Sequence, residues 1–309
     1  VGDFSQFFDR LNHKYLKKMI RHILEDKSLD DADYAIFKNI TRFSYINASD
    51  IENEKGSLRR DMRYLNKYFE TKEFQDVKKR YLKDYQIPQG SSISAVYANI
   101  YMIEFDKKIN DFITSHNGMY RRYCDDIIMV VPMMTDKEIQ KDYDKEIDGF
   151  IYGVRDQIPN LILNEDKTEH YFYHEGHIET KNRKRCSLSY LGFTFDGRKV
   201  RIREKSVFKY YCRAYKKIKS VKMSKDEKAY NAGRKAVYKL YTHLGAKRKK
   251  GYGNFLTYAY KSHDIFDESS LLESEIRNQV KRHWWKIEQK LKTSNCAEYN
   301  ISEGESSQI

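Results

Sequence analysis

The sequence predicts an α+β fold, because two β-hairpin patterns stand among helical ones. The first covers residues 120–131, where β-branched and aromatic residues flank the adjacent Asp125 and Asp126. The second covers residues 189–203, with one strand on each side of the turn Asp196-Gly197, a dipeptide typical of short hairpins. Apolar residues recur at helical spacing through much of the remaining chain.

The paired carboxylates of the first hairpin are the strongest sign of a functional site. Asp125 and Asp126 would repel each other at a hairpin tip unless a divalent ion or a basic group neutralised them. Hard carboxylate oxygens favour Mg²⁺ or Mn²⁺. The alternative is an ordinary solvated turn.

A third carboxylate stands near the beginning of the sequence. Residues 1–24 predict a strand end that runs into a helix, and Asp3 falls at the strand end. If Asp3 points toward the Asp125–Asp126 turn, the three carboxylates could hold two metal ions. A helix cap or a surface aspartate is the alternative for Asp3.

The middle of the chain alternates helices and loops. Residues 26–83 predict a helical insertion with a loop near residues 47–58. The loop Gln86–Ser92 then opens a helix, and such a helix start suits a phosphate or a sugar. A capping box at Thr135–Glu138 begins another helix.

A short strand and a lysine follow this helix. Leu161–Leu163 predicts the strand, and Lys167 lies on the loop after it. Beside a phosphate site Lys167 could act as a proton donor, whereas a solvated surface lysine is the alternative.

The chain from about residue 205 to residue 292 is helical, aromatic and basic. An apolar stripe from Ala229 to Leu244 predicts the buried face of one helix. The basic run Lys247, Arg248, Lys249 and Lys250 predicts either a contact with a phosphate backbone or a solvated charge run. Residues 294–309 predict a disordered polar tail.

Composition indicates the class of partner. Lys and Arg number 58 against 45 Asp and Glu, a net charge of +13, which indicates a polyanionic partner. With 26 Tyr and 16 Phe among these cations, nucleic acid is favoured, because bases stack on rings. A basic protein without such a partner is the alternative.

Other features favour a cytosolic protein without a membrane partner. No run of about 18 apolar residues exists, and no signal peptide opens the chain. The four cysteines are far apart, which predicts free thiols rather than a zinc site or disulfides. Because the sequence begins Val1-Gly2 without an initiator Met, we expect it to start inside a longer protein.

Five blocks of the sequence, in this order, resemble the palm motifs of reverse transcriptases. The similarity is greatest to the bacterial group-II-intron-like and retron branch, and within it to the defence-associated and abortive-infection antiviral enzymes. The blocks are Val1–His13, Gln86–Ser94 with Ala98–Tyr101, Tyr123–Asp126, Asn164–Thr168 and Tyr190–Phe193.

The resemblance implies a right-hand polymerase architecture. Residues 1–203 would form the palm, an antiparallel sheet with packed helices, with the helical insertion at about residues 26–83. Residues 204–293 would form a basic α-helical thumb. The family's fingers, which precede the first palm motif, are largely missing from this chain.

The resemblance also implies an activity, RNA-directed DNA polymerisation. A primer end would be extended from dNTPs with two Mg²⁺ or Mn²⁺ ions, in the bacterial cytoplasm and in antiphage defence. Asp3 and Asp125 would bind the ions, Asp126 would support them, and Lys167 would protonate the pyrophosphate.

Further residues take their roles from the same resemblance. Phe8 would exclude the 2′-hydroxyl of a ribonucleotide, with an ordinary core phenylalanine as the alternative. Gln89 and Gly90 would line the nucleotide and template pocket. Basic thumb residues would track an A-form hybrid along its backbone. The primer end would be held by Leu191, Gly192 and Phe193.

The implied partners are an RNA template, a DNA or RNA primer and dNTPs. The resemblance also allows two further partners, a dedicated non-coding RNA and a second copy of the chain. Two alternative functions stay open. One is template-independent or protein-primed DNA synthesis, as in abortive-infection relatives. The other is a non-catalytic RNA-binding scaffold.

Overall fold

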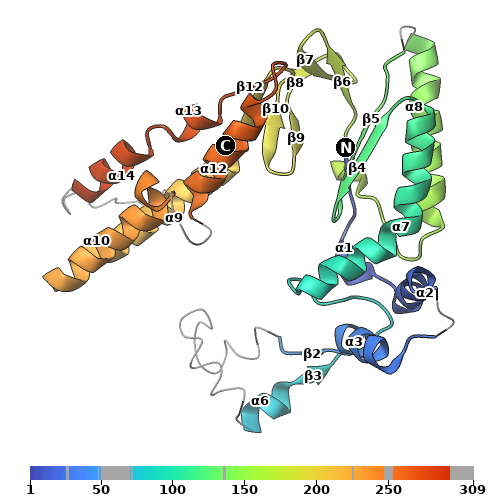
Figure 1. The fold of residues 1–309 in the computed structure, drawn as a ribbon, viewed down its shortest axis with the longest axis horizontal. Helices are drawn as coiled ribbons and strands as arrows, with labels where there is room; N and C mark the ends of the chain where they lie inside the picture. The colour runs from blue at the N-terminus through green and yellow to red at the C-terminus, as the bar shows by residue number, and fades with distance from the viewer. Residues whose placement is uncertain are drawn as a thin grey trace, which may run out of the picture. The chain divides into compact units, whose positions relative to one another are not determined.

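The computed structural model describes residues 1–25, 28–47, 49, 70, 72–134, 137–224, 226–246 and 253–292 (Figure 1). The chain divides into two compact units, Val1–Glu169 and His170–Ile309. Both combine helices with antiparallel strand pairs, so the α+β prediction is confirmed. No described helix is long and apolar enough to cross a bilayer. The predicted division at residue 203 between palm and thumb stays a prediction.

The first unit contains a small three-stranded sheet packed against helices. In chain order its elements are β1 (Gly2–Asp3), α1 (Phe7–Arg10), α2 (His13–Ile23), α3 (Asp31–Thr41), β2 (Ser44–Tyr45), α6 (Lys72–Val77), β3 (Lys79–Arg80), α7 (Ser92–Ser115), β4 (Met119–Tyr123), β5 (Asp126–Val130), α8 (Lys137–Asp156) and the 3₁₀ turn η1 (Glu165–Lys167).

Helix α7 forms the centre of the first unit's core. Its buried residues recur every three or four positions, so they form one stripe along the helix. Phe105 in this stripe meets Phe4, which follows β1, edge to face at a ring-centroid distance of 5.4 Å. The core therefore fixes the end of β1 against the helix. The buried stripe comprises Tyr97, Tyr101, Phe105, Ile109 and Ile113.

The sheet has the order β1-β5-β4, with β1 antiparallel to β5. On the other side of β1, Ser5 N–H donates to the carbonyl of Ile162 at 2.8 Å, and Asn164 N–H donates to the carbonyl of Asp3 at 2.8 Å. The strand predicted over Leu161–Leu163 is therefore reduced to a single bridge between Leu163 and Phe4.

Among its described residues, the insertion at 26–83 contains strands as well as helices, and its predicted helical character as a whole stays a prediction. Besides α3 and α6, it contains a two-stranded ribbon in which β2 pairs with β3. These strands have two residues each, which is too short for an alternating pattern to be visible in the sequence. The predicted loop at residues 47–58 falls largely outside the described residues, and so do the first residues of the capping box before α8.

The second unit contains two small sheets and a group of helices. In chain order its elements are β6 (Tyr171–His174), β7 (His177–Thr180), β8 (Arg185–Cys186), β9 (Leu188–Tyr190), β10 (Phe193–Phe195), β11 (Lys199–Ile202), α9 (Glu204–Lys222), α10 (Glu227–Tyr241), α11 (His243–Ala246), α12 (Phe255–Asp267), β12 (Glu273–Ser274), α13 (Ile276–Val280) and α14 (His283–Lys292).

The predicted hairpin around Asp196-Gly197 is present as β10 and β11. Its turn depends on Gly197, whose φ is +111°, and on the Asp196 carboxylate, which accepts the Lys199 N–H at 2.7 Å. The first predicted strand, however, folds back on itself at Leu191-Gly192 and forms two strands, β9 and β10. Both turn residues have positive φ, as a two-residue turn of type I′ requires.

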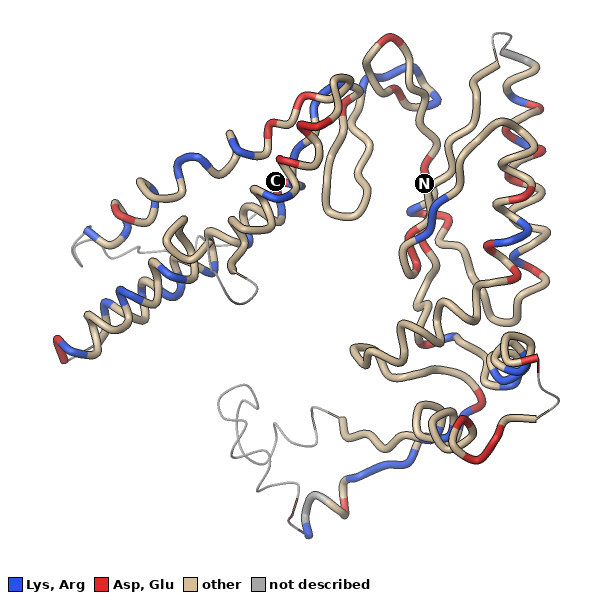
Figure 2. The backbone as a smooth tube through the Cα atoms, viewed as in Figure 1, with Lys and Arg blue, Asp and Glu red and all other residues tan. Residues whose placement is uncertain are grey.

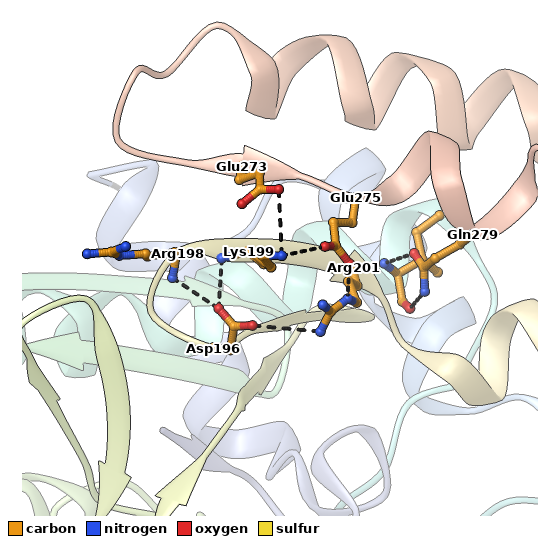
Figure 3. A network of polar contacts seen from close by, with 8 residues as sticks. Asp196, Arg198, Lys199, Arg201, Glu273, Glu275 and Gln279 are labelled. Atoms are coloured by element: carbon orange, nitrogen blue, oxygen red, sulfur yellow. Dashed lines mark hydrogen bonds and ion pairs between the residues drawn. The ribbon is translucent and has the colours of Figure 1, made fainter.

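A polar network attaches the C-terminal helices to this sheet (Figure 3). Glu275 accepts hydrogen bonds from Lys199 Nζ at 2.8 Å and from Arg201 Nε at 2.6 Å. Gln279 donates to the carbonyl of Ile202 and accepts its N–H, both at 2.8 Å. The amide of Gln279 thus replaces a neighbouring strand at the end of β11.

The prediction that the apolar residues from Ala229 to Leu244 form the buried face of one helix is wrong. Of these residues only Val237 is buried, whereas Leu240 and Leu244 are 49% and 60% exposed. Helix α10 instead packs around Val237 with tyrosines, which contribute more apolar area than alanines.

Cys124, Cys186 and Cys212 are free thiols, as predicted. The predicted tail at residues 294–309 lies outside the described residues.

Candidate active site at the β1–β5 pairing

Asp125 lies in the tight turn between β4 and β5. Cys124 before it has a φ of +54°, an uncommon conformation for a residue other than glycine. The carbonyl of Asp125 accepts the N–H of Phe4 at 3.1 Å. The turn is therefore held against the end of β1.

Asp3 comes from β1, where it is the register partner of Asp126 on β5. Its side chain is 14% exposed, and its Oδ2 accepts a hydrogen bond from Lys167 Nζ at 2.7 Å. Lys167 ends the turn η1, which the hydrogen bond from Asn164 N–H to the Asp3 carbonyl holds beside β1. The structure thus brings together the carboxylates and the lysine that the sequence singled out.

The pKa values reflect the crowding of charge. The pKa of Asp125 is raised, first by burial and then by the negative charge of Asp3 and a hydrogen bond between the two carboxyl groups. The pKa of Lys167 is raised, chiefly by its hydrogen bond and ion pair with Asp3. The exposed Lys167 ammonium is therefore charged at neutral pH, and the half-buried pair of carboxyl groups favours a cation.

The donor set fits a hard divalent cation, since Asp3 and Asp125 place carboxylate oxygens side by side. Among the described residues, no group of three or more His, Cys, Asp or Glu is placed to hold a metal ion. Asp126 is half-buried at the start of β5. In the structure a basic group, Lys167, neutralises Asp3, whereas the sequence had suggested a basic group or a divalent ion for Asp125 and Asp126. The two metal ions stay a prediction.

The predicted nucleotide-pocket residues lie in the same unit. Phe8 is half-buried in α1, and its ring meets Phe7 edge to face at 5.5 Å. The carbonyl of Phe8 accepts the N–H of Ile87 at 3.0 Å, which attaches the following loop to α1. In that loop Gln89 and Gly90 are exposed, and Gly90 has a φ of +96°. Their role in binding a nucleotide stays a prediction.

The predicted primer-grip residues belong to the second unit. Leu191 and Gly192 form the tip between β9 and β10, and Leu191 is 39% exposed with a φ of +46°. Phe193 instead faces the helices, with its ring 5.1 Å from that of Phe266. The basic run Lys247–Lys250 lies outside the described residues.

The second unit has a basic surface on α9 and α10. Figure 2 shows Lys and Arg along both helices, and Asp226 and Glu227 are the only acidic residues between Lys205 and Ala246. Tyrosines lie beside other cations of this unit, and Lys286 Nζ lies 4.2 Å from the ring centroid of Tyr211. Tyr211 is itself buried, so the positive charge of α9 and α10 is the feature that suits a polyanion.

No protein-family model matches the chain, and no curated protein sequence matches it. One similar solved structure is apo telomerase from Candida tropicalis, truncated from its C-terminal domain. Their sequences are 15% identical over 63% of this chain and 33% of the telomerase chain, with a TM-score of 0.36. The chain spans about a third of that protein's length. This low similarity assigns no function to the chain, and the residues of the site are the basis for one.

The sequence interpretation missed a half-buried ion pair next to the turn. Arg122 on β4 donates to both carboxylate oxygens of Asp106 on α7, and Tyr120 also donates to Asp106. A signal was present, because residues two apart in a strand share a face. Arg122 therefore lies on the same face as the buried Tyr120, where an unpaired cation would be costly.

Proposed function

We propose that this chain is a nucleotidyltransferase of the reverse-transcriptase type, which extends a nucleic-acid primer from dNTPs. The observation that carries the proposal is the group formed by Asp3, Asp125 and Lys167. Three segments far apart in sequence meet there, and the two carboxyl groups remain adjacent although their charges repel. Such a group suits phosphoryl chemistry, in which charge neutralisation and positioning dominate.

The residues have separate roles in this proposal. Asp3 and Asp125 would hold two Mg²⁺ or Mn²⁺ ions, with Asp126 supporting them. Bound there, the ions would lower the pKa of the primer hydroxyl and neutralise the triphosphate. Lys167 carries a proton on Nζ and would give it to the leaving pyrophosphate. Its pKa is raised while it contacts Asp3, so it becomes a better acid once that contact is released.

The positive charge along α9 and α10 supports a nucleic-acid partner. An RNA template, a DNA or RNA primer and dNTPs are the substrates we propose. A dedicated non-coding RNA, self-association, a bacterial cytoplasmic setting and a role in antiphage defence stay predictions from the sequence resemblance.

The test is incorporation of each labelled dNTP with Mg²⁺ or Mn²⁺, on an RNA template with a DNA primer and on co-purifying RNA. We expect Asp125→Ala to lose about 10³-fold in rate, because it removes a carboxylate that holds the ions. The matched control is Asp142→Ala, which removes an exposed carboxylate of the same unit and should retain full activity.

The product distinguishes the alternatives. DNA that is complementary to the RNA and unaffected by protease supports template copying. A product that shifts after protease treatment indicates protein priming. Wild-type rates in Asp125→Ala, or no product with either metal, would overturn the proposal and leave the RNA-binding scaffold.

A further inference from the structure

Arg122 is a buried cation directly beneath the catalytic turn. Its side chain is 7% exposed, and Asp106 opposite it is 31% exposed. Arg122 Nε donates to Asp106 Oδ1 at 2.8 Å, and Nη2 donates to Oδ2 at 2.6 Å. This paired geometry fixes the plane of the guanidinium group as well as its position.

The remaining nitrogen of Arg122 reaches the turn itself. Nη1 donates to the carbonyl oxygen of Cys124 at 2.9 Å and to Asn99 Oδ1 at 3.2 Å. Asn99 and Asp106 both belong to α7. The guanidinium group therefore connects the long core helix to the residue that precedes Asp125.

This contact defines the direction of the Asp125 side chain. The left-handed backbone of Cys124 is disfavoured for a residue with a Cβ, so it needs compensating contacts. Arg122 holds the carbonyl of Cys124, and Phe4 N–H holds the carbonyl of Asp125 at 3.1 Å. The peptide groups on both sides of the Asp125 Cα are thus fixed, one from α7 and one from the end of β1.

We propose that Arg122, oriented by Asp106, is a positioning residue that sets the Asp125 carboxylate beside Asp3 for divalent-cation binding. This inference rests on the proposed function. A lysine at position 122 would keep the charge, but one ammonium group cannot replace a planar fork that contacts a carboxylate and a carbonyl together. In Arg122→Lys the Asp125 carboxylate would therefore lose its position at the cation site, although β4 would keep the positive charge at residue 122.

The test measures Mn²⁺ affinity of the full chain by titration calorimetry, together with kcat and KM for dNTP incorporation. We expect Arg122→Lys to weaken Mn²⁺ binding about tenfold and to lower kcat with little change in the KM for dNTP. The matched variant is Tyr120→Phe. It removes the hydrogen bond from the Tyr120 hydroxyl to Asp106 but leaves the contact between Arg122 and Cys124.

The two variants separate positioning from stability. Tyr120→Phe should lower the melting temperature and leave the Mn²⁺ affinity within about twofold of wild type. If Arg122→Lys does not fold, Asp106→Asn serves in its place. This variant keeps the guanidinium group but leaves one acceptor oxygen instead of two, so one of the two hydrogen bonds from Arg122 is lost. We expect that variant to bind Mn²⁺ about threefold more weakly.

The outcomes also separate this inference from the proposed function. Wild-type Mn²⁺ affinity in the folded variant at Arg122 or Asp106, or equal losses of affinity in Tyr120→Phe, would overturn the positioning role alone. Absence of Mn²⁺ binding that depends on Asp125 in the wild type would overturn the proposed function and this inference together.

Discussion

Replacement of Gln279 by alanine tests the attachment of the C-terminal helices to the sheet. The side-chain amide of Gln279 makes two hydrogen bonds of 2.8 Å to the backbone of Ile202, a residue that is 1% exposed (Figure 3). Each buried group left unpaired costs about 1–3 kcal/mol. We therefore expect Gln279→Ala to lower the free energy of unfolding of the second unit by about 3 kcal/mol.

Urea unfolding followed by tryptophan fluorescence is the suitable assay. Both tryptophans of the chain, Trp284 and Trp285, lie in α14, so the signal reports on the second unit alone. Trp284 stacks on Tyr238 at a ring-centroid distance of 5.1 Å and will change environment on unfolding. With a slope of about 2 kcal/mol per molar urea, the midpoint should fall by about 1.5 M.

Two further variants make this measurement decisive. Asn278→Ala changes the exposed neighbour of Gln279 on α13, so its midpoint should stay close to that of the wild type. Gln279→Glu keeps an acceptor for the Ile202 N–H but loses the donor, so an intermediate midpoint is expected. A midpoint for Gln279→Ala equal to that of Asn278→Ala would refute the reasoning.

Three other predictions follow from the site and the sheet. In metal-free buffer, Asp125→Asn should raise the melting temperature near neutral pH. Asp125 has a raised pKa in the folded protein, so the wild type loses stability as the pH rises through that pKa. The increase in melting temperature of Asp125→Asn over the wild type should therefore become smaller in acid. Glu275→Gln should cost about 1–2 kcal/mol near neutral pH by urea unfolding. Its two basic partners lower the pKa of Glu275 to about 2. Ionised Glu275 therefore stabilises the folded protein above about pH 4.5, and the difference in free energy of unfolding between the wild type and Glu275→Gln should vanish as the pH falls toward 2. Phe8→Ala should increase ribonucleotide incorporation at least about tenfold in competition with dNTPs, while unchanged selectivity would show an ordinary core residue.

The hairpin that carries Asp125 could be predicted from sequence, because alternation and a polar turn are local signals. The register that sets Asp3 opposite Asp126 could not, since it depends on pairing between distant segments. Lys167 was recognised as a candidate, but its 2.7 Å contact with Asp3 follows only from the fold. A local pattern identified Asp125 and Asp126, the order of several motifs along the chain singled out Asp3 and Lys167, and the packing determined their partners.

The predictions that were wrong or missing concern features that depend on contacts rather than on a local sequence pattern. The ribbon of β2 and β3 and the extra turn at Leu191-Gly192 depend on strands of two to four residues, in which periodicity is too short to be seen. The stripe on α10 failed because tyrosines at neighbouring positions covered the core in place of alanines. Arg122 was missed because its partner Asp106 lies on a different element.

The hydrogen bond between Lys167 and Asp3 closes a loop of 164 residues. Contacts of such separation form late in folding, because the entropy of closing the loop is lost before the contact contributes any energy. A nascent chain can fold the hairpin of β4 and β5 soon after it emerges from the ribosome. The complete charge group must wait until residues 162–169 are available to pair with β1. Any chain truncated before this segment would contain every predicted carboxylate and still lack the assembled site.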